Sequence, residues 1–174
     1  MVAALSIPVV DRAIDAIWNV LRSIPDPEIP VISICDLGIV RDVIVHGVNV
    51  EVVITPTYSG CPAMHAIEED IRGKLAAAGF ADARITTVLS PAWTTDWMSE
   101  AGRANLRKYG IAPPSTSGPE TTVVRFVTRR HFMPACPHCG SDDTERLSEF
   151  GSTACKALYR CVECREPFDY FKAI

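Results

Sequence analysis

Two pairs of cysteines near the C-terminus constrain the fold of this chain more than any other feature. Cys136 and Cys139 form a C-x2-C pair, and after residues 140–160 Cys161 and Cys164 form a second one. Each pair can hold one metal ion from a tight turn, and two pairs supply a tetrahedron of thiolates. The gap is slightly longer than is usual for zinc ribbons. The pattern predicts a four-cysteine site with zinc as a structural metal, although the same thiolates can also hold iron or an iron–sulfur cluster.

The composition argues against the alternative that these pairs are disulfides. The chain has seven cysteines, an odd number, in 174 residues. Its apolar N-terminus carries Asp11, Arg12 and Asp15, unlike a signal peptide, and no apolar run is long enough for a membrane span. We therefore expect a cytoplasmic protein with metal ligands and free thiols. A formal net charge of −4 gives no reason to expect a nucleic-acid partner.

The remaining chain predicts an α+β fold in two parts. Apolar periodicity indicates a helix at 8–24, two β-branched runs indicate a hairpin at 39–54, and a second helix and a third strand follow. This is a small domain in the order helix, strand, strand, helix, strand. We expect three segments: a first domain at 1–112, a linker and leading strand at 113–129, and a zinc ribbon at 130–174.

Cys61 is the thiol whose position suggests reactivity. Pro62 favours the first position of a helix, which predicts Cys61 as its N-cap. There the helix dipole would lower the pKa of the thiol, although an inert, buried N-cap is an equal alternative. A Cys–His pair with His65 is also conceivable. Hydroxyl groups lie nearby in the sequence, on Thr55, Thr57 and Ser59.

Carboxylates and one further thiol complete the candidate residues. Asp26 and Glu28 lie on a proline-rich loop, and Asp36 precedes Gly38 within an apolar run. These carboxylates either bond turn amides or border a functional surface. Cys155 is the one cysteine of the C-terminal module outside the two pairs, and it is either a spare nucleophile or an alternative metal ligand.

An ordered set of short motifs in the first part resembles the SufT-like iron–sulfur assembly factors. The set spans roughly residues 10–112 and consists of Asp26-Pro-Glu28, Asp36-Leu-Gly38, Thr55–Pro62 and Pro91-Ala-Trp93. The C-terminal part resembles the D subunits of bacterial phenylacetyl-CoA epoxidase systems. Its motifs are Cys136-Pro-His-Cys139-Gly-Ser, Phe150–Cys161 and Cys164–Phe168.

These resemblances imply a function in phenylacetate catabolism. The epoxidase oxygenates the aromatic ring of phenylacetyl-CoA at a di-iron centre, and its reductase subunit carries an iron–sulfur cluster and a flavin. The resemblance implies a non-catalytic maturation factor that works with the iron–sulfur assembly machinery. Its expected client is the cluster of the reductase subunit, and the oxygenase subunit is the second candidate.

The residue roles follow from the same resemblance. Cys61 would hold iron or a cluster transiently, Cys155 would be a second functional thiol, and the loop residues Asp26, Glu28, Asp36, Thr55, Thr57 and Ser59 would support them. Three alternatives remain open: a structural or docking subunit of the epoxidase complex, an enzyme with Cys61 as nucleophile, and a homodimer.

Overall fold

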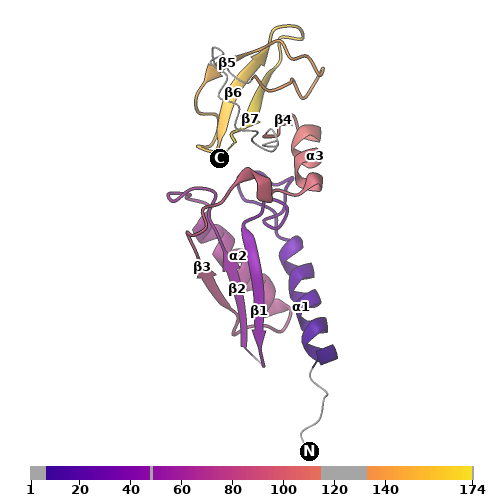
Figure 1. Ribbon diagram of the computed structural model, residues 1–174, viewed down its shortest axis with the longest axis vertical. Coiled ribbons are helices and arrows are strands. Elements are labelled where there is room, and N and C mark those ends of the chain that lie inside the picture. The colour runs from indigo at the N-terminus through magenta and orange to yellow at the C-terminus, as the bar shows by residue number, and fades with distance from the viewer. Residues whose placement is uncertain (1–6, 48, 115–132, 174) are drawn as a thin grey trace, which may run out of the picture. The chain divides into compact units, whose positions relative to one another are not determined.

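The computed structural model describes residues 7–47, 49–114 and 133–173, and the chain divides into two compact units, Met1–Gly102 and Arg103–Ile174. Figure 1 shows the elements of each unit. The division precedes the predicted domain boundary at residue 112. Its physical reason is β4 (Ile111–Ala112), which pairs with a strand of the second unit rather than the first. Nearly all of the predicted linker and leading strand at 113–129 lies outside the described residues.

A three-stranded sheet forms the centre of the first unit. β1 (Val40–His46) and β2 (Asn49–Ile54) make an antiparallel hairpin, and β3 (Arg84–Thr87) pairs parallel to β2, so that the order is β1-β2-β3. α1 (Ile7–Arg22) precedes the hairpin, and α2 (Met64–Ala77) connects the two parallel strands. The predicted α+β order is confirmed.

The core of this unit lies between the sheet and the two helices. α1 packs against β1 and α2, and β2 alternates so that every second residue is buried. Burying a branched aliphatic side chain contributes roughly 1.5–3 kcal/mol. The buried residues contributed by α1, α2 and β2 are Ile17, Leu21, Ile67, Ile71, Leu75, Val50, Val52 and Ile54.

Strand direction brings three loops to one end of this sheet. β2 and β3 are parallel, with Ile54 opposite Thr87, and Val40 at the start of β1 also lies opposite Ile54. Three loops therefore begin or end at this end of the sheet, and they comprise residues 23–39, 55–63 and 88–94. A 3-10 helix (Thr95–Trp97) and α3 (Glu100–Lys108) follow the third loop.

The second unit is a four-stranded sheet in the order β4-β7-β6-β5. β5 (Thr144–Ser148), β6 (Lys156–Cys161) and β7 (Pro167–Phe171) are antiparallel, and β4 pairs parallel to β7. Its small core consists of Ala112, Cys136, Ala157, Tyr159, Cys161, Phe168 and Tyr170. Within the described ranges of the chain, no helix has the length and apolar character to cross a membrane.

Candidate functional site

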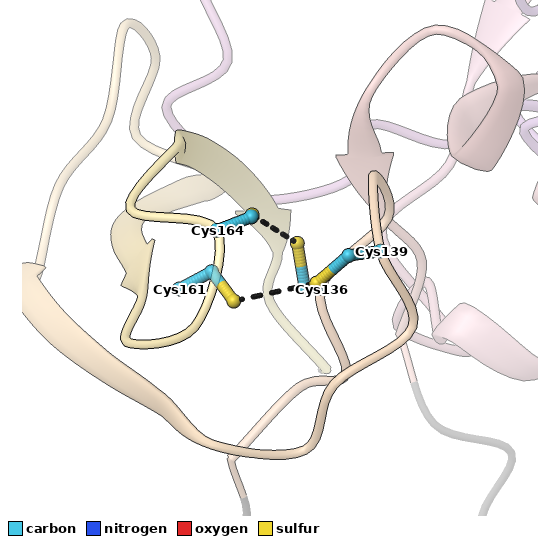
Figure 2. Close-up of side chains that lie close together, drawn as sticks. All are labelled: Cys136, Cys139, Cys161 and Cys164. Carbon is cyan, nitrogen blue, oxygen red and sulfur yellow. Dashed lines mark hydrogen bonds between the residues drawn. The ribbon is translucent and has the colours of Figure 1, made fainter.

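The four paired cysteines come together in the second unit, as Figure 2 shows. One ligand atom from each of Cys136, Cys139, Cys161 and Cys164 lies within 4.8 Å of the others. Among the described residues this is the one group of three or more potential ligand side chains with such geometry. The first pair precedes β5, and the second is at the end of β6.

Backbone turns position each pair. Gly140 has φ +79° and donates its amide to the Cys136 carbonyl at 2.9 Å, a conformation that suits glycine. In the second turn Arg165 takes the corresponding left-handed conformation with φ 63°. A hydrogen bond from the amide of Cys164 is the largest cause that lowers the pKa of Cys161 to about 7. In the same turn a backbone hydrogen bond from Glu166 lowers the pKa of Cys164, but burial and the three other thiols outweigh it and raise this pKa to about 12. Within the group the first thiolate therefore forms at Cys161.

The sulfur positions fit a tetrahedral metal. The Sγ atoms of Cys136 and Cys164 lie 3.7 Å apart, and those of Cys139 and Cys161 lie 3.5 Å apart. Zinc–sulfur bonds of about 2.3 Å in a tetrahedron place sulfurs about 3.8 Å apart. Zinc at this position would cross-link the two turns and leave no position open for a substrate.

Cys61 lies at the converging loop end of the first unit, but the predicted N-cap is wrong. α2 begins at Met64 with Ala63 at the N-cap position, and Cys61 occurs in the preceding turn, where its carbonyl accepts from the Met64 amide. The Pro62 signal was misleading because a separate turn precedes the helix.

The predicted direction of the Cys61 pKa is also wrong. Burial raises the pKa of the half-buried thiol, and the carboxylates of Glu28 and Asp26 add to this. A backbone hydrogen bond from Ala63 and the Thr57 side chain act in the opposite direction without outweighing burial. The thiol is therefore protonated at neutral pH until something replaces its proton.

The structure separates the three predicted carboxylates by role. Asp26 is buried, and its Oδ1 accepts the amides of Glu28 at 2.9 Å and Ile29 at 2.8 Å, which fixes the loop. Glu28 and Asp26 both act electrostatically on Cys61. Asp36 instead accepts from Ser33 and Ser99, so its carboxylate holds the loops together.

The three predicted hydroxyl residues also differ. Thr57 is buried and hydrogen-bonds the thiol of Cys61. Thr55 is 1% exposed, and its Oγ1 has no hydrogen-bond partner within the described part of the protein. Ser59 is exposed. Of the three, Thr57 has the direct contact with the candidate thiol.

Cys155 is not a member of the four-thiol group. It is 6% exposed, and its Sγ lies 3.1 Å from Thr153 Oγ1. His65 likewise does not form the conceivable pair with Cys61, because its Nδ1 lies 3.6 Å from Glu69 Oε2 on the exposed side of α2.

Two residues distant in the sequence fix the loops at this end of the sheet: Ser99, which sequence reasoning missed, and Trp93, which it named only as part of a motif. Ser99 donates to Asp36 at 2.6 Å, and Trp93 Nε1 donates to the Leu37 carbonyl at 3.1 Å. The Pro91-Ala-Trp93 motif was a signal for the second contact, but no local pattern indicated the first.

Two family models match the chain in succession. Residues 14–86 match the iron-sulfur cluster assembly protein family. Residues 120–172 match the PaaD zinc beta ribbon domain. The candidate thiol at Cys61 lies in the first match, and all four paired cysteines lie in the second.

Individual relatives agree with these matches. The chain is 50% identical over 91% of its length to an Escherichia coli (strain K12) protein named as a candidate D subunit of 1,2-phenylacetyl-CoA epoxidase, and covers 92% of it. It is 38% identical over 52% of its length to an Fe-S protein maturation auxiliary factor of Porphyromonas gingivalis (strain ATCC BAA-308 / W83), covering 87% of that protein.

A solved structure has a similar fold. A domain of unknown function, DUF59, from Bacillus anthracis superposes with a TM-score of 0.52 and 25% identity, covering 55% of this chain and 92% of that one. The first unit thus has the fold of that domain.

Proposed function

The chain belongs to the family of the D subunits of 1,2-phenylacetyl-CoA epoxidase, and we propose that it acts as a non-catalytic maturation factor of that epoxidase system. In this role it helps to assemble a metallocentre, and its client is the iron–sulfur cluster of the reductase subunit. Iron or a cluster is the cargo of the protein.

The observation that carries the proposal is the environment of Cys61. The thiol lies within the segment that matches an iron–sulfur cluster assembly family, and it contacts Thr57 and is close enough to Glu28 and Asp26 for their charges to act on it. A transfer factor must release its cargo, and one half-buried thiol with few fixed co-ligands binds metal more weakly than a closed four-thiolate site. The related Fe-S protein maturation auxiliary factor supports the same assignment.

The roles of the two metal-binding regions differ in this proposal. The four thiols of Cys136, Cys139, Cys161 and Cys164 hold a structural zinc ion, which stabilises a unit too small for a large apolar core. Cys61 takes up the cargo by exchanging its proton for a metal, since a thiol must be deprotonated to bind. The carboxylates of Glu28 and Asp26 favour the arrival of a cation.

The test measures the reductase subunit. Reductase purified anaerobically from a strain that lacks this chain is expected to contain little iron and acid-labile sulfide while its protein level stays normal. Complementation with the wild-type chain restores both, and Cys61→Ser does not. Cys35→Ser is the matched control, because Cys35 is a partly buried thiol of the same unit. A full cluster complement in the deletion strain would contradict the reductase assignment.

A structural or docking subunit of the epoxidase complex is the second candidate. The observation in its favour is the closed geometry of the four thiols, which leaves the second unit without an open ligand position. This candidate predicts co-purification with the oxygenase subunits at fixed stoichiometry and an effect of its loss on complex assembly rather than on cluster content.

A further inference from the structure

The second unit has a hollow on the sheet face that carries its core. The hollow has a volume of about 350 Å³ and is lined by Arg146, Glu149, Ala157, Tyr159, Tyr170, Lys172 and Ala173. This volume is at the lower end of the range for binding pockets. None of these residues is a paired cysteine, so the hollow is separate from the metal centre.

Aromatic rings and a small residue create the hollow. The rings of Tyr159 and Tyr170 meet edge to face with centroids 5.6 Å apart. Ala157 pairs with Tyr170 across β6 and β7, and its short side chain leaves space beside the rings. The floor is therefore formed by two aromatic rings and a methyl group, against which an aliphatic or aromatic side chain can pack, while Arg146, Glu149 and Lys172 make the rest of the lining polar.

The rim carries an excess positive charge. Arg146, which lies opposite Tyr159 on β5, forms an ion pair with Glu149 at 2.8 Å. Lys172 donates to the backbone carbonyl of Glu149 at 3.3 Å, and its ammonium lies 4.4 Å from the centre of the Phe150 ring. Because Glu149 is already paired with Arg146, no carboxylate among the described residues forms an ion pair with Lys172, and its charge is available to an acidic partner.

Two neighbouring features suit a partner chain rather than a small molecule. Phe150 is 62% exposed beside Lys172, although it is a large aromatic residue. β5 is the outermost strand of the sheet formed by the described residues. Within that part of the chain its outer edge is unpaired, so an extended segment can pair along it while a side chain enters the hollow.

We infer that this hollow, with Lys172 in its lining and Phe150 against Lys172, docks an extended segment of a partner protein that carries an apolar side chain next to carboxylates. The chain's own residues 115–132 match the rim poorly in charge, because they contain Arg125, Arg129 and Arg130 against Glu120. The inference rests on the proposed function only in taking the epoxidase reductase and oxygenase subunits as partners.

The test uses the full-length, metal-loaded chain and overlapping peptides that cover these subunits. Peptides that bind are expected to combine acidic and apolar residues and to bind more weakly as salt rises. Lys172→Glu and Phe150→Ser should each weaken binding about tenfold or more. Lys108→Glu is the matched control, since Lys108 is an exposed cation of the same unit that lies outside the lining of the hollow. Circular dichroism and metal content verify that each variant is folded.

Three outcomes would overturn the inference. The first is that no peptide binds, and the second is that both rim variants bind as the wild type does. The third is that a chain with residues 115–132 replaced by a Gly-Ser linker of equal length binds the peptide much more tightly, which would identify that segment as the occupant. If peptides bind but the reductase of the deletion strain has normal clusters, the result would contradict the proposed function and leave the docking inference standing.

Discussion

Asp36 accepts a hydrogen bond from Ser99 Oγ at 2.6 Å, across 63 positions of the chain. The other carboxylate oxygen of Asp36 accepts from Ser33 Oγ at 2.7 Å, and the backbone carbonyl of Asp36 accepts the Ser99 amide at 2.8 Å. One residue therefore joins the loop after α1 to the start of α3. Gly102 packs closely against this contact: an added Cβ would lie 2.8 Å from Ile32 Cδ1 and 3.1 Å from the Asp36 carbonyl oxygen, so a side chain at this position would force its neighbours to shift.

Asp36→Ala should therefore destabilise the first unit. The substitution removes hydrogen bonds to a charged group, each worth roughly 1.5–3 kcal/mol. Urea unfolding followed by circular dichroism measures the change. Asp82→Ala is the control, because Asp82 is exposed in the turn before β3 and its loss should be close to neutral. Equal stability of the two variants would show that the hydrogen bonds of the Asp36 carboxylate do not contribute to the free energy of unfolding.

The sequence predicted some of these features and not others for identifiable reasons. Each cysteine pair is a short sequence motif, so its spacing alone predicted that the four thiols could bind one metal ion. The order of helices and strands followed from periodicity. The contact between Asp36 and Ser99 could not be predicted, because it depends on how distant loops meet at one end of the sheet. The pKa of Cys61 was predicted in the wrong direction because burial and the nearby carboxylates of Asp26 and Glu28 are tertiary effects.

Cargo uptake at Cys61 should become stronger as pH rises. Because burial raises the pKa of this thiol, the proton is present throughout the neutral range, and a metal must displace it. Binding should therefore increase about tenfold per pH unit while the thiol remains protonated. Titrating anaerobic protein with ferrous iron at several pH values measures this, with Cys61→Ser as the blank. Affinity that does not vary with pH would exclude proton exchange at Cys61.

Thr57→Val should raise the pKa of Cys61 further. The Thr57 side chain hydrogen-bonds the thiol and lowers this pKa, and valine keeps the shape without the hydroxyl. Alkylation of Cys61, followed by mass spectrometry across a pH series, should then shift to higher pH. Ser59→Ala is the control, since Ser59 is exposed in the same loop. An unshifted profile for Thr57→Val would remove Thr57 from the site.

Thr55→Val should stabilise the protein. The hydroxyl of Thr55 is buried without a hydrogen-bond partner in the described part of the chain, and such a group costs roughly 1–3 kcal/mol. Thermal unfolding measures the gain. If the variant also loses cluster delivery to the reductase, the hydroxyl serves the cargo, whereas a loss of stability would mean that it is hydrogen-bonded in solution.

Removing a paired cysteine should release the metal from the second unit. Cys136→Ser and Cys161→Ser each leave three thiolates, so metal content should fall and the unit should unfold, because binding and folding are coupled. Elemental analysis and urea unfolding follow the two effects. Cys155→Ser is the matched control, since Cys155 lies outside the four-thiol group. Metal loss in that variant would make Cys155 a ligand.

Asp169→Asn should destabilise the second unit more than Lys156→Met does. The side chain of Lys156 is 6% exposed, and its ammonium lies 3.3 Å from Asp169 Oδ2, whereas the Asp169 side chain is 23% exposed. Loss of the carboxylate leaves a buried cation unpaired, which costs roughly 3 kcal/mol. Loss of the ammonium leaves a carboxylate that water can still reach, and methionine fills the same space. The double variant should recover most of the stability lost in Asp169→Asn. Urea unfolding of the metal-loaded proteins measures this order, and a larger loss for Lys156→Met would contradict it.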